Sequence, residues 1–237
     1  MLKPKFVFSK KALFLSENNF PATIIKYSSI FFACFIFISE ISNAQHLNNL
    51  ENRILVNLSE NRTKGTTKFM QFISNSTSTI SLGIPSVVLL KGIITNDKAE
   101  KQRGWYMLET FAANAAETYI LKYAINRKRP YEVNPKIIKA SSGGSPSFPS
   151  GHSSEAFAAA TSLSLVYPKW YVIVPAFTWA GTVGFSRIYL GVHYPSDVLA
   201  GAILGSGTAW VMYKLNKRLQ SGKKKKTSVA NHPFILE

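Results

Sequence analysis

Five long stretches of nearly uncharged, apolar residues constrain this chain more than any other feature. They cover residues 73–90, 105–125, 156–168, 170–185 and 198–213, and only 105–125 carries charged side chains. Each is near or just below the ~20 residues that a helix needs to cross a bilayer, so hydropathy fits a membrane bundle or a soluble core. Strict alternation of apolar and polar residues is almost absent. We therefore predict an all-α helical bundle of about five or six apolar helices.

The charges between these stretches favour the membrane alternative. If the stretches cross a bilayer, the loops at 126–152 and 187–197 lie on one side. Lys98, Lys101, Arg103, Lys169 and the C-terminal lysines then lie on the opposite side. Basic loops mark the cytoplasmic side of a membrane protein. We expect a bacterial inner-membrane protein whose two motif-bearing loops face the periplasm, with a soluble periplasmic protein as the alternative.

The beginning of the chain has the pattern of an export signal. Several lysines precede an apolar run at 30–38, and Ser42-Asn43-Ala44 supplies small residues before Gln45. We interpret residues 1–44 as a signal peptide or an N-terminal anchor, and residues 45–71 as a polar, amphipathic lead-in. The single cysteine, Cys34, excludes a disulfide framework and a cysteine-based zinc site.

The formal net charge of +16 suits partners that carry phosphate. Nucleic acid, an anionic membrane surface and a phosphorylated substrate all meet that description. The basic tail, residues 216–237, contains four consecutive lysines at 223–226 but no aromatic platform or nucleic-acid motif. We therefore expect no nucleic-acid partner, and interpret the tail as a solvated segment or an anchor beside anionic lipid.

The first of three short motifs runs from Lys122 to Pro130. Lys122 and Arg129 are seven positions apart, close to two helical turns, so both can point from one helix face. Pro130 discourages helix at the preceding residue, so we predict that the helix ends at Arg129. We interpret Arg127 and Lys128 as surface charge, with contact to a second phosphate as the alternative. Alone, this motif is no more than a basic helix end.

The second motif is Ser147-Phe148-Pro149-Ser150-Gly151-His152, which precedes an alanine-rich helix. A Pro-Ser-Gly turn at a helix start leaves backbone N–H groups available to bind an anion. The Ser150 hydroxyl adds a donor, and His152 lies within reach of a bound phosphate ester. Alone, the motif is also typical of an ordinary helix cap.

The third motif contains Ser186-Arg187, His193 and Asp197. The carboxylate of Asp197 can hold one imidazole nitrogen of His193 and leave the other free to act as a base or nucleophile. The Arg187 guanidinium is a forked donor suited to phosphate oxygens. Alone, a histidine near an aspartate is more often a structural pair.

Together, Lys-x6-Arg-Pro, Pro-Ser-Gly-His and Ser-Arg-x5-His-x3-Asp occur in the order and spacing of a known signature. They resemble the type 2 phosphatidic acid phosphatase and vanadium haloperoxidase superfamily, without a mismatch at the defining positions. The resemblance covers residues 72–215, which we expect to form a helical bundle domain with its active site at one end.

The resemblance implies a role for each motif residue. His193 would attack phosphorus to form a phosphohistidine, Asp197 would orient it, and His152 would protonate the leaving oxygen and then activate water. The non-bridging oxygens would be held by Lys122, Arg129, Arg187, the Ser150 hydroxyl and the Gly151 amide. Preorganised cations and N–H groups can meet phosphoryl charge without a metal, so no metal site is expected.

We therefore expect a metal-independent phosphatase acting on monoesters or pyrophosphates, with a phosphorylated lipid as the favoured substrate. The residues leave open phosphatidic acid, an isoprenoid carrier and a lipid A phosphate, and they give no oligomeric state. The loop at 131–146 is expected to shape selectivity. Two alternatives are a soluble periplasmic acid phosphatase and a vanadium-dependent haloperoxidase. No cofactor is expected, although vanadate could occupy the same site as a phosphate mimic or as the haloperoxidase cofactor.

Overall fold

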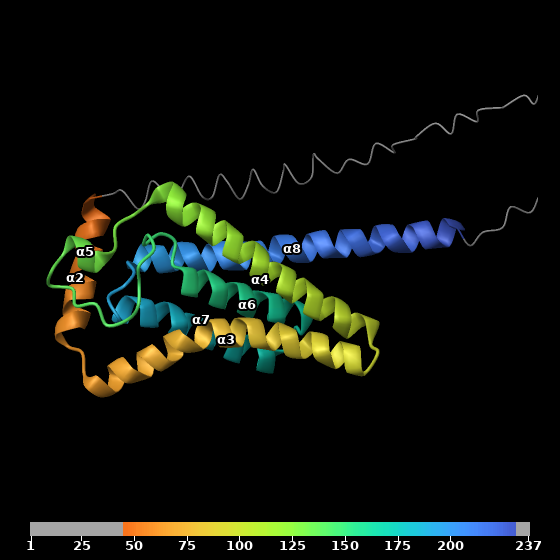
Figure 1. The fold of residues 1–237 in the computed structure, drawn as a ribbon, viewed down its shortest axis with the longest axis horizontal. Helices are drawn as coiled ribbons and strands as arrows, with labels where there is room; N and C mark the ends of the chain where they lie inside the picture. Colours follow the sequence, from red (N-terminus) through yellow and green to blue (C-terminus); the bar gives the residue numbers. More distant parts are fainter. Residues whose placement is uncertain (1–44, 231–237) are drawn as a thin grey trace, which may run out of the picture.

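The structure is a computed structural model that describes residues 45–230. Its helices are α2 (Gln45–Glu60), α3 (Lys64–Ile94), α4 (Lys98–Ile125), α5 (Pro130–Val133), α6 (Gly151–Val166), α7 (Trp170–Tyr189) and α8 (Pro195–Ala230). The five long helices form a bundle, and α2 and α5 lie at one end of it (Figure 1). No strand occurs within residues 45–230, so the predicted all-α bundle is confirmed. The predicted signal segment or anchor lies outside the described residues.

Helix α3 buries small residues and exposes large apolar ones. Its buried positions are Ser74, Thr77, Ser81, Pro85 and Gly92. Its exposed positions include Phe72, Leu82, Val87, Leu90 and Ile94. The core-facing side of a helix in water is apolar, whereas helices in lipid pack through small residues and turn large apolar side chains outward. The side-chain arrangement of α3 is therefore that of a membrane helix.

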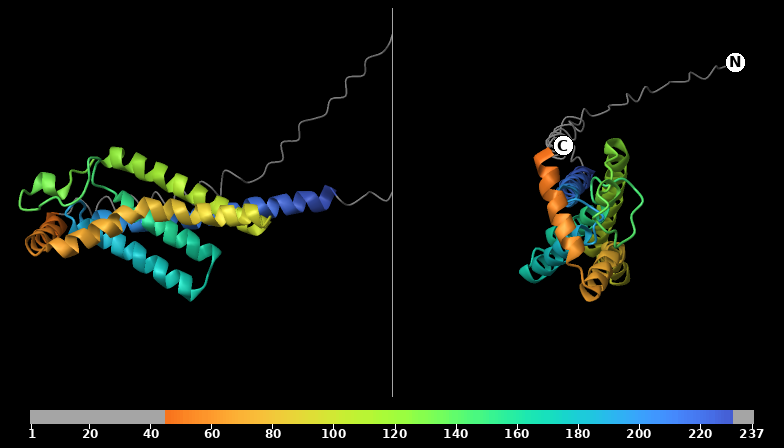
Figure 2. Two further views of the ribbon diagram at one scale, coloured as in Figure 1. Left: turned by 60° about the horizontal axis from the view of Figure 1, so that its bottom comes forward. Right: turned by 90° about the vertical axis from the view of Figure 1, so that its left-hand side faces the viewer.

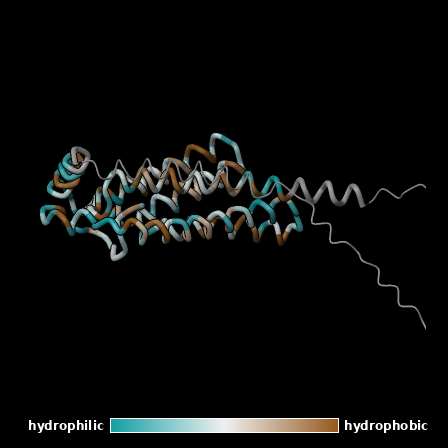
Figure 3. The backbone as a smooth tube through the Cα atoms, turned by 90° about the horizontal axis from the view of Figure 1, so that it is seen from above, coloured by the Kyte–Doolittle hydropathy of each residue, from teal (hydrophilic) through white to brown (hydrophobic). Residues whose placement is uncertain are grey.

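Exposed apolar side chains are not confined to α3, since Ile120 of α4, Val174 of α7 and Leu199 of α8 are exposed as well. In Figure 3 hydrophobic residues recur along the length of the bundle. In the described part of the chain, α3 and the Pro195–Leu219 part of α8 are long and apolar enough to cross a membrane. Four of the five predicted apolar runs lie within helices that extend beyond them, whereas the run at 156–168 continues two residues past the end of α6 at Val166. Helix α3 already begins at Lys64 and α8 continues into the predicted tail.

The end of α4 differs from its predicted position. Asn126 adopts the left-handed conformation, with φ of 51°, and its N–H bonds to the carbonyl of Lys122. An asparagine tolerates this conformation and commonly ends a helix with it. The prediction that the helix reaches Arg129 is therefore wrong: α4 ends at Ile125, and Arg129 has extended backbone angles.

Close packing of α6 against α8 depends on two glycines of α8. A Cβ atom at Gly201 would lie 2.6 Å from the carbonyl oxygen of Ser150, and one at Gly205 would lie 2.0 Å from that of Ser154. Residues four apart share a helix face, and small residues in this spacing allow two backbones to approach. The Ser150 N–H also bonds to the Asp197 carbonyl at 3.0 Å. The start of α6 is thereby fixed to the start of α8.

The two motif-bearing loops lie at the same end of the bundle, as predicted. The Ala140 N–H donates to the Leu190 carbonyl at 3.0 Å, which joins the loop after α5 to the turn after α7. Helix α2 crosses this end, with buried Leu55 packed against Ile137 and Tyr194 (Figures 1 and 2). The turns at 95–97 and 167–169 lie at the opposite end (Figure 1).

The α6–α8 contact gives a stability prediction. Gly205→Ala places a methyl group against the Ser154 backbone, so we expect the free energy of unfolding to fall by about 1–3 kcal/mol. Gly181→Ala is the matched control, because a Cβ at Gly181 meets nothing within 4 Å. Thermal unfolding of the detergent-purified variants measures the difference. Equal midpoints for the two variants would contradict the close contact.

Candidate active site

All three sequence motifs converge at the end of the bundle that α2 crosses. Lys122 lies in the last turn of α4, and Arg129 immediately precedes α5. Ser150 to His152 start α6, Arg187 lies in the last turn of α7, and His193 lies in the turn before α8. Residues that are far apart in the sequence therefore surround one site.

Two of the predicted phosphate-binding cations are buried and hydrogen-bonded to neutral carbonyl groups. The Lys122 Nζ donates to the Pro146 carbonyl at 2.6 Å. The Arg129 guanidinium donates to the carbonyls of Ser145 and Val192, each at 2.8 Å. Because carbonyl oxygens carry no net charge, these bonds orient the cations without neutralising them.

The third cation, Arg187, is the most buried of the set, with 1% of its surface exposed. It donates to the hydroxyls of Ser74 and Ser141 and to the carbonyl of Ser142. Its Nε atom is buried and has no hydrogen-bond partner. A buried donor without a partner costs free energy, so this atom leaves part of the site unsatisfied.

The site therefore concentrates positive charge. Within residues 45–230, no carboxylate forms a salt bridge with Lys122, Arg129 or Arg187. Burying cations without counter-ions is unfavourable, and a bound anion would relieve that cost. Also within these residues, no group of three or more His, Cys, Asp or Glu side chains could hold a metal ion. The donors present suit an oxyanion.

His193 lies beside these cations and is 2% exposed. Its Nε2 is 3.4 Å from Nη1 of Arg129, while its Nδ1 is 3.6 Å from the carboxylate of Asp197. Burial lowers the pKa of His193 to about 3; Asp197 opposes this shift, and Arg129 and Arg187 add to it. The imidazole is therefore neutral near pH 7, with Nε2 turned toward the cations.

Asp197 is fully buried and held from several directions. Its Oδ2 accepts a hydrogen bond from the Ser147 hydroxyl at 2.5 Å and one from the Tyr194 N–H at 2.9 Å. Its Oδ1 accepts a bond from Arg127 Nη1 at 2.6 Å. The interpretation of Arg127 as surface charge is therefore wrong. Only its position in the basic run before Arg129 hinted at a role, because its partner lies 70 residues away.

The start of α6 presents backbone N–H groups to the same region. The Ser150 hydroxyl is the helix cap, accepting bonds from the N–H and hydroxyl of Ser153 at 3.5 and 2.9 Å. A Cβ at Gly151 would lie 3.7 Å from the Cε of Lys122, so the chain passes close to this cation. The first N–H groups of a helix have no partner within it and favour anions.

A cavity of about 360 Å³ lies between α4 and α6 beside this helix start. Its polar end contains Lys122, Ser145, Gly151 and His152. The rest of its lining combines the apolar and aromatic side chains Phe111, Ala115, Tyr119 and Tyr123 with the polar side chains Asn114, Thr118 and Glu155. The cavity thus joins the candidate phosphate site to a partly apolar space between the two helices.

Two solved structures share this fold. The transmembrane PAP2-type phosphatidylglycerolphosphate phosphatase from Bacillus subtilis is 26% identical, with a TM-score of 0.68 over 82% of this chain and 97% of that one. LpxE from Aquifex aeolicus is 24% identical, with a TM-score of 0.57 over 68% of this chain and 93% of that one. This second similarity is one of fold.

Curated relatives match the motif-bearing part of the chain. The lipid A 4'-phosphatase of Bacteroides thetaiotaomicron is 36% identical over 124 residues, which are 47% of this chain and 54% of that protein. The undecaprenyl-diphosphatase of Sulfolobus acidocaldarius is 38% identical over 95 residues, 40% and 44% of the two chains. The chain spans about half the length of the curated relatives it matches.

A family model covers the region in which the predicted site residues lie. It is the model of the PAP2 superfamily, and it matches residues 103–221, from the first turns of α4 into the basic tail. That range is half of the chain and contains all three motifs. The order of the motifs, their convergence in space and this match agree, and the chain belongs to the PAP2 superfamily.

Proposed function

We propose that this protein is a metal-independent phosphatase of phosphorylated lipids that works through a phosphohistidine intermediate. The observation that supports the proposal is the set of three buried cations without carboxylate partners around a buried, neutral His193. A phosphoryl group supplies the negative charge that this arrangement lacks, and fixed donors stabilise the charge on its oxygens during transfer.

In the proposed first step, Nε2 of His193 attacks phosphorus and the bond from phosphorus to the leaving oxygen breaks. Asp197 keeps the remaining proton on Nδ1 and stabilises the positive charge on the ring. His152, protonated once the negatively charged substrate is bound, gives a proton to the leaving oxygen. In the second step His152 accepts a proton from water, the water oxygen attacks phosphorus, and the bond to Nε2 breaks. Phosphate leaves and both histidines return to their initial states.

The proposed phosphate ligands follow from the same geometry. Lys122, Arg129 and Arg187 would bind the non-bridging oxygens, together with the Gly151 amide at the start of α6. Ser150 contributes as the cap that holds this helix start, and its hydroxyl would contact the bound phosphate as well. We propose residues 72–215 as the unit that carries these groups.

A lipid substrate is supported by the surroundings of the site. The lining of the 360 Å³ cavity between α4 and α6 includes Phe111, Ala115, Tyr119 and Tyr123, against which a hydrocarbon chain could lie while the phosphate reaches His152 and Lys122. The relatives named above act on lipid A, on undecaprenyl diphosphate and on phosphatidylglycerolphosphate. We propose the same class of substrate here, a phosphate monoester or pyrophosphate on a lipid.

The proposed location is a bacterial inner membrane with the active site on the periplasmic side. The two helices able to span a membrane support the location. The loops and helix ends opposite the site carry basic residues, as expected for a cytoplasmic surface. These basic residues include Lys98, Lys101, Lys169, Lys214 and Arg218.

Phosphate release from a panel of substrates tests the function. We expect detergent-purified protein to release phosphate from at least one of phosphatidic acid, phosphatidylglycerophosphate, undecaprenyl pyrophosphate and lipid A. Its kcat/KM for that lipid should exceed its kcat/KM for p-nitrophenyl phosphate or glucose 6-phosphate. EDTA should leave the rate of phosphate release unchanged. His193→Ala should lose turnover because the nucleophile is gone, and mass spectrometry of the quenched wild-type protein should find phosphate on His193.

Three results would contradict this proposal. Release from soluble esters alone would favour an acid phosphatase, and halide oxidation with vanadate and peroxide but no phosphate release would favour a haloperoxidase. Substantial turnover by His193→Ala would remove this residue as the nucleophile.

The neutrality of His193 gives a prediction about pH. Its pKa is lower in the folded protein than the ordinary 6.5, so the unfolded chain binds this proton first as pH falls. Stability from His193 is therefore complete above about pH 6.5 and is lost between pH 6.5 and 3. The unfolding midpoint should drop more between pH 7.5 and 5 for the wild type than for His193→Asn. Equal drops would show that His193 is not held neutral.

A further inference from the structure

Arg127 contacts the proposed catalytic carboxylate instead of the phosphate site. Its Nη1 donates to Asp197 Oδ1 at 2.6 Å and to the Ser196 hydroxyl at 2.8 Å. Its guanidinium carbon lies 4.0 Å from the centre of the Tyr194 ring, close enough for a cation–π interaction. Hydrogen bonds at its edge and the Tyr194 ring against its face thus fix the position of the guanidinium.

Glu51 of helix α2 holds the other side of this guanidinium. Its Oε2 accepts from Arg127 Nη2 at 3.1 Å, and its Oε1 accepts the Ser196 N–H at 2.6 Å. Glu51 is only 5% exposed, so this ion pair is shielded from water. Helix α2 is anchored here by buried Leu55, and it lies before the region that the PAP2 model matches.

Arg127 bonds to both carboxylates, and together with Ser147 and the Tyr194 N–H it fixes the orientation of Asp197. With Oδ1 bound to Arg127, Oδ2 is left facing Nδ1 of His193 at 3.6 Å. Loss of Arg127 would remove a short, charge-assisted bond and leave a buried carboxylate with fewer donors. Asp197 would then hold the imidazole less firmly during attack.

We propose that Arg127, held by Glu51, is a positioning residue for Asp197, and that α2 therefore forms part of the active centre. This proposal rests on the proposed function of the site. It also extends the functional unit before residue 72, because Glu51 lies outside that boundary. Arg127 acts through Asp197 and does not contact the phosphoryl group.

Substitutions at the two residues test this role. Arg127→Gln should lower kcat by about 10- to 100-fold, the range found when outer partners of metal-site ligands are removed. The inhibition constant for inorganic phosphate should stay unchanged, because the phosphate-binding cations remain. Arg127→Lys should retain part of the rate, since one ammonium can reach Asp197 but cannot bridge both carboxylates. Glu51→Gln should lower kcat less than Arg127→Gln.

The double variant and a neighbouring control sharpen the test. If Glu51 acts through Arg127, the Arg127→Gln/Glu51→Gln protein should have the kcat of Arg127→Gln alone. Lys128→Gln removes one charge from the same run at an exposed position and should leave kcat unchanged. Wild-type kcat in Arg127→Gln would overturn the proposal, as would equal losses of kcat and phosphate affinity. Absence of turnover in the wild type would instead count against the proposed function.

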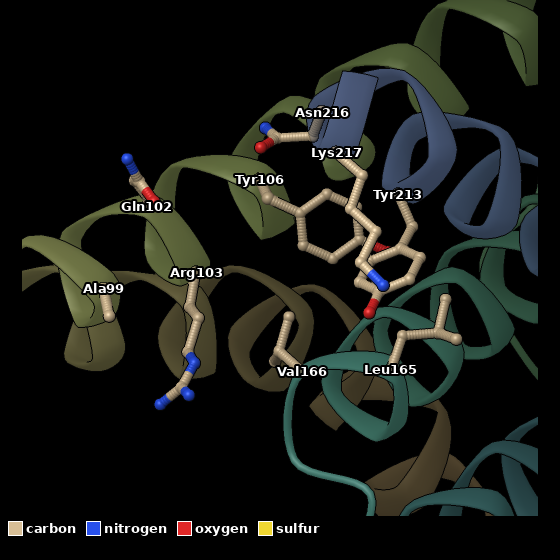
Figure 4. Close-up of a pocket in the computed structure, with 9 residues that line it drawn as sticks. All are labelled: Ala99, Gln102, Arg103, Tyr106, Leu165, Val166, Tyr213, Asn216 and Lys217. Carbon is tan, nitrogen blue, oxygen red and sulfur yellow. The ribbon is translucent and has the colours of Figure 1, made fainter. Parts of the chain in front are cut away.

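A second cavity, of about 260 Å³, lies at the opposite end of the bundle, between α4, α6 and α8 (Figure 4). Tyr106, Tyr213, Leu165 and Val166 form its apolar surfaces, and Arg103 and Lys217 add cations at its edge. The Lys217 ammonium lies 5.0 Å from the centre of the Tyr213 ring. In Figure 4 the Arg103 guanidinium points away from the two tyrosines, and it pairs with Glu100 at 2.6 Å.

The surroundings of this cavity are typical of a membrane surface. Three of the four tryptophans, Trp105, Trp170 and Trp210, lie around this end with 56%, 76% and 43% of their surface exposed. Exposed tryptophans gather at the level of lipid headgroups. Lys214 lies over the ring of Trp210, with its Nζ 5.4 Å from the ring centre.

We infer independently that this second cavity binds the headgroup of an anionic phospholipid. Basic residues outnumber acidic ones at this end, and basic pockets between membrane helices bind anionic headgroups. Lys217 would meet the phosphate, while the tyrosine rings and Leu165 would contact the adjoining glycerol and chains. Phosphatidylglycerol fits this chemistry, and as a phosphodiester it is not a substrate of the proposed reaction.

Lipid-dependent stability tests the headgroup site without any assay of turnover. Protein in nanodiscs of phosphatidylglycerol should unfold at a higher temperature than in nanodiscs of phosphatidylcholine. Lys217→Gln should lose at least half of this difference, whereas exposed Lys214→Gln, which does not line the cavity, should retain it. If all three proteins showed the same difference in unfolding temperature, the headgroup site would be overturned. The lipid dependence would then come from the general charge of the surface. Stabilisation by soluble glycerol phosphate in detergent would reassign the site to a free phosphate.

Discussion

Three buried cations without carboxylate partners are the constraint on which the rest of this structure depends. Lys122, Arg129 and Arg187 are held by carbonyl and hydroxyl oxygens, which fix their positions but leave their charge uncompensated. Such a cluster repels itself and is tolerated only where the surrounding packing enforces it. A tetrahedral oxyanion would relieve this repulsion, which is why we propose a phosphoryl group as the ligand of the site.

Close contact between helix backbones provides this packing. Gly201 and Gly205 let α8 approach the carbonyls of α6, which ties the helix start at Ser150 to Asp197. Large apolar side chains are then left on the outside of helices such as α3. An exterior of this kind is stable in lipid, and in the proposed function a lipid substrate would reach the site from the side through the cavity between α4 and α6.

The sequence was sufficient to predict the helical class, the end of the bundle that carries the site and the residues that meet there. It failed at the end of α4, where the left-handed turn at Asn126 overrides the spacing of Lys122 and Arg129. It also failed for Arg127 and Glu51. Their contact joins residues 76 apart, and no local pattern distinguishes a lysine or arginine that is buried from one that faces water.

The sequence by itself determined the family, because the residue types, order and spacing of its three motifs are those of the PAP2 superfamily, and that resemblance is the basis for proposing an oxyanion site with a histidine nucleophile. Only the tertiary structure decided how the side chains of the site are held in place. The orientation of Asp197 depends on Arg127 and on a carboxylate from α2, and the neutral state of His193 depends on burial. Burial and long-range contacts are properties of packed helices, and a linear pattern does not contain them.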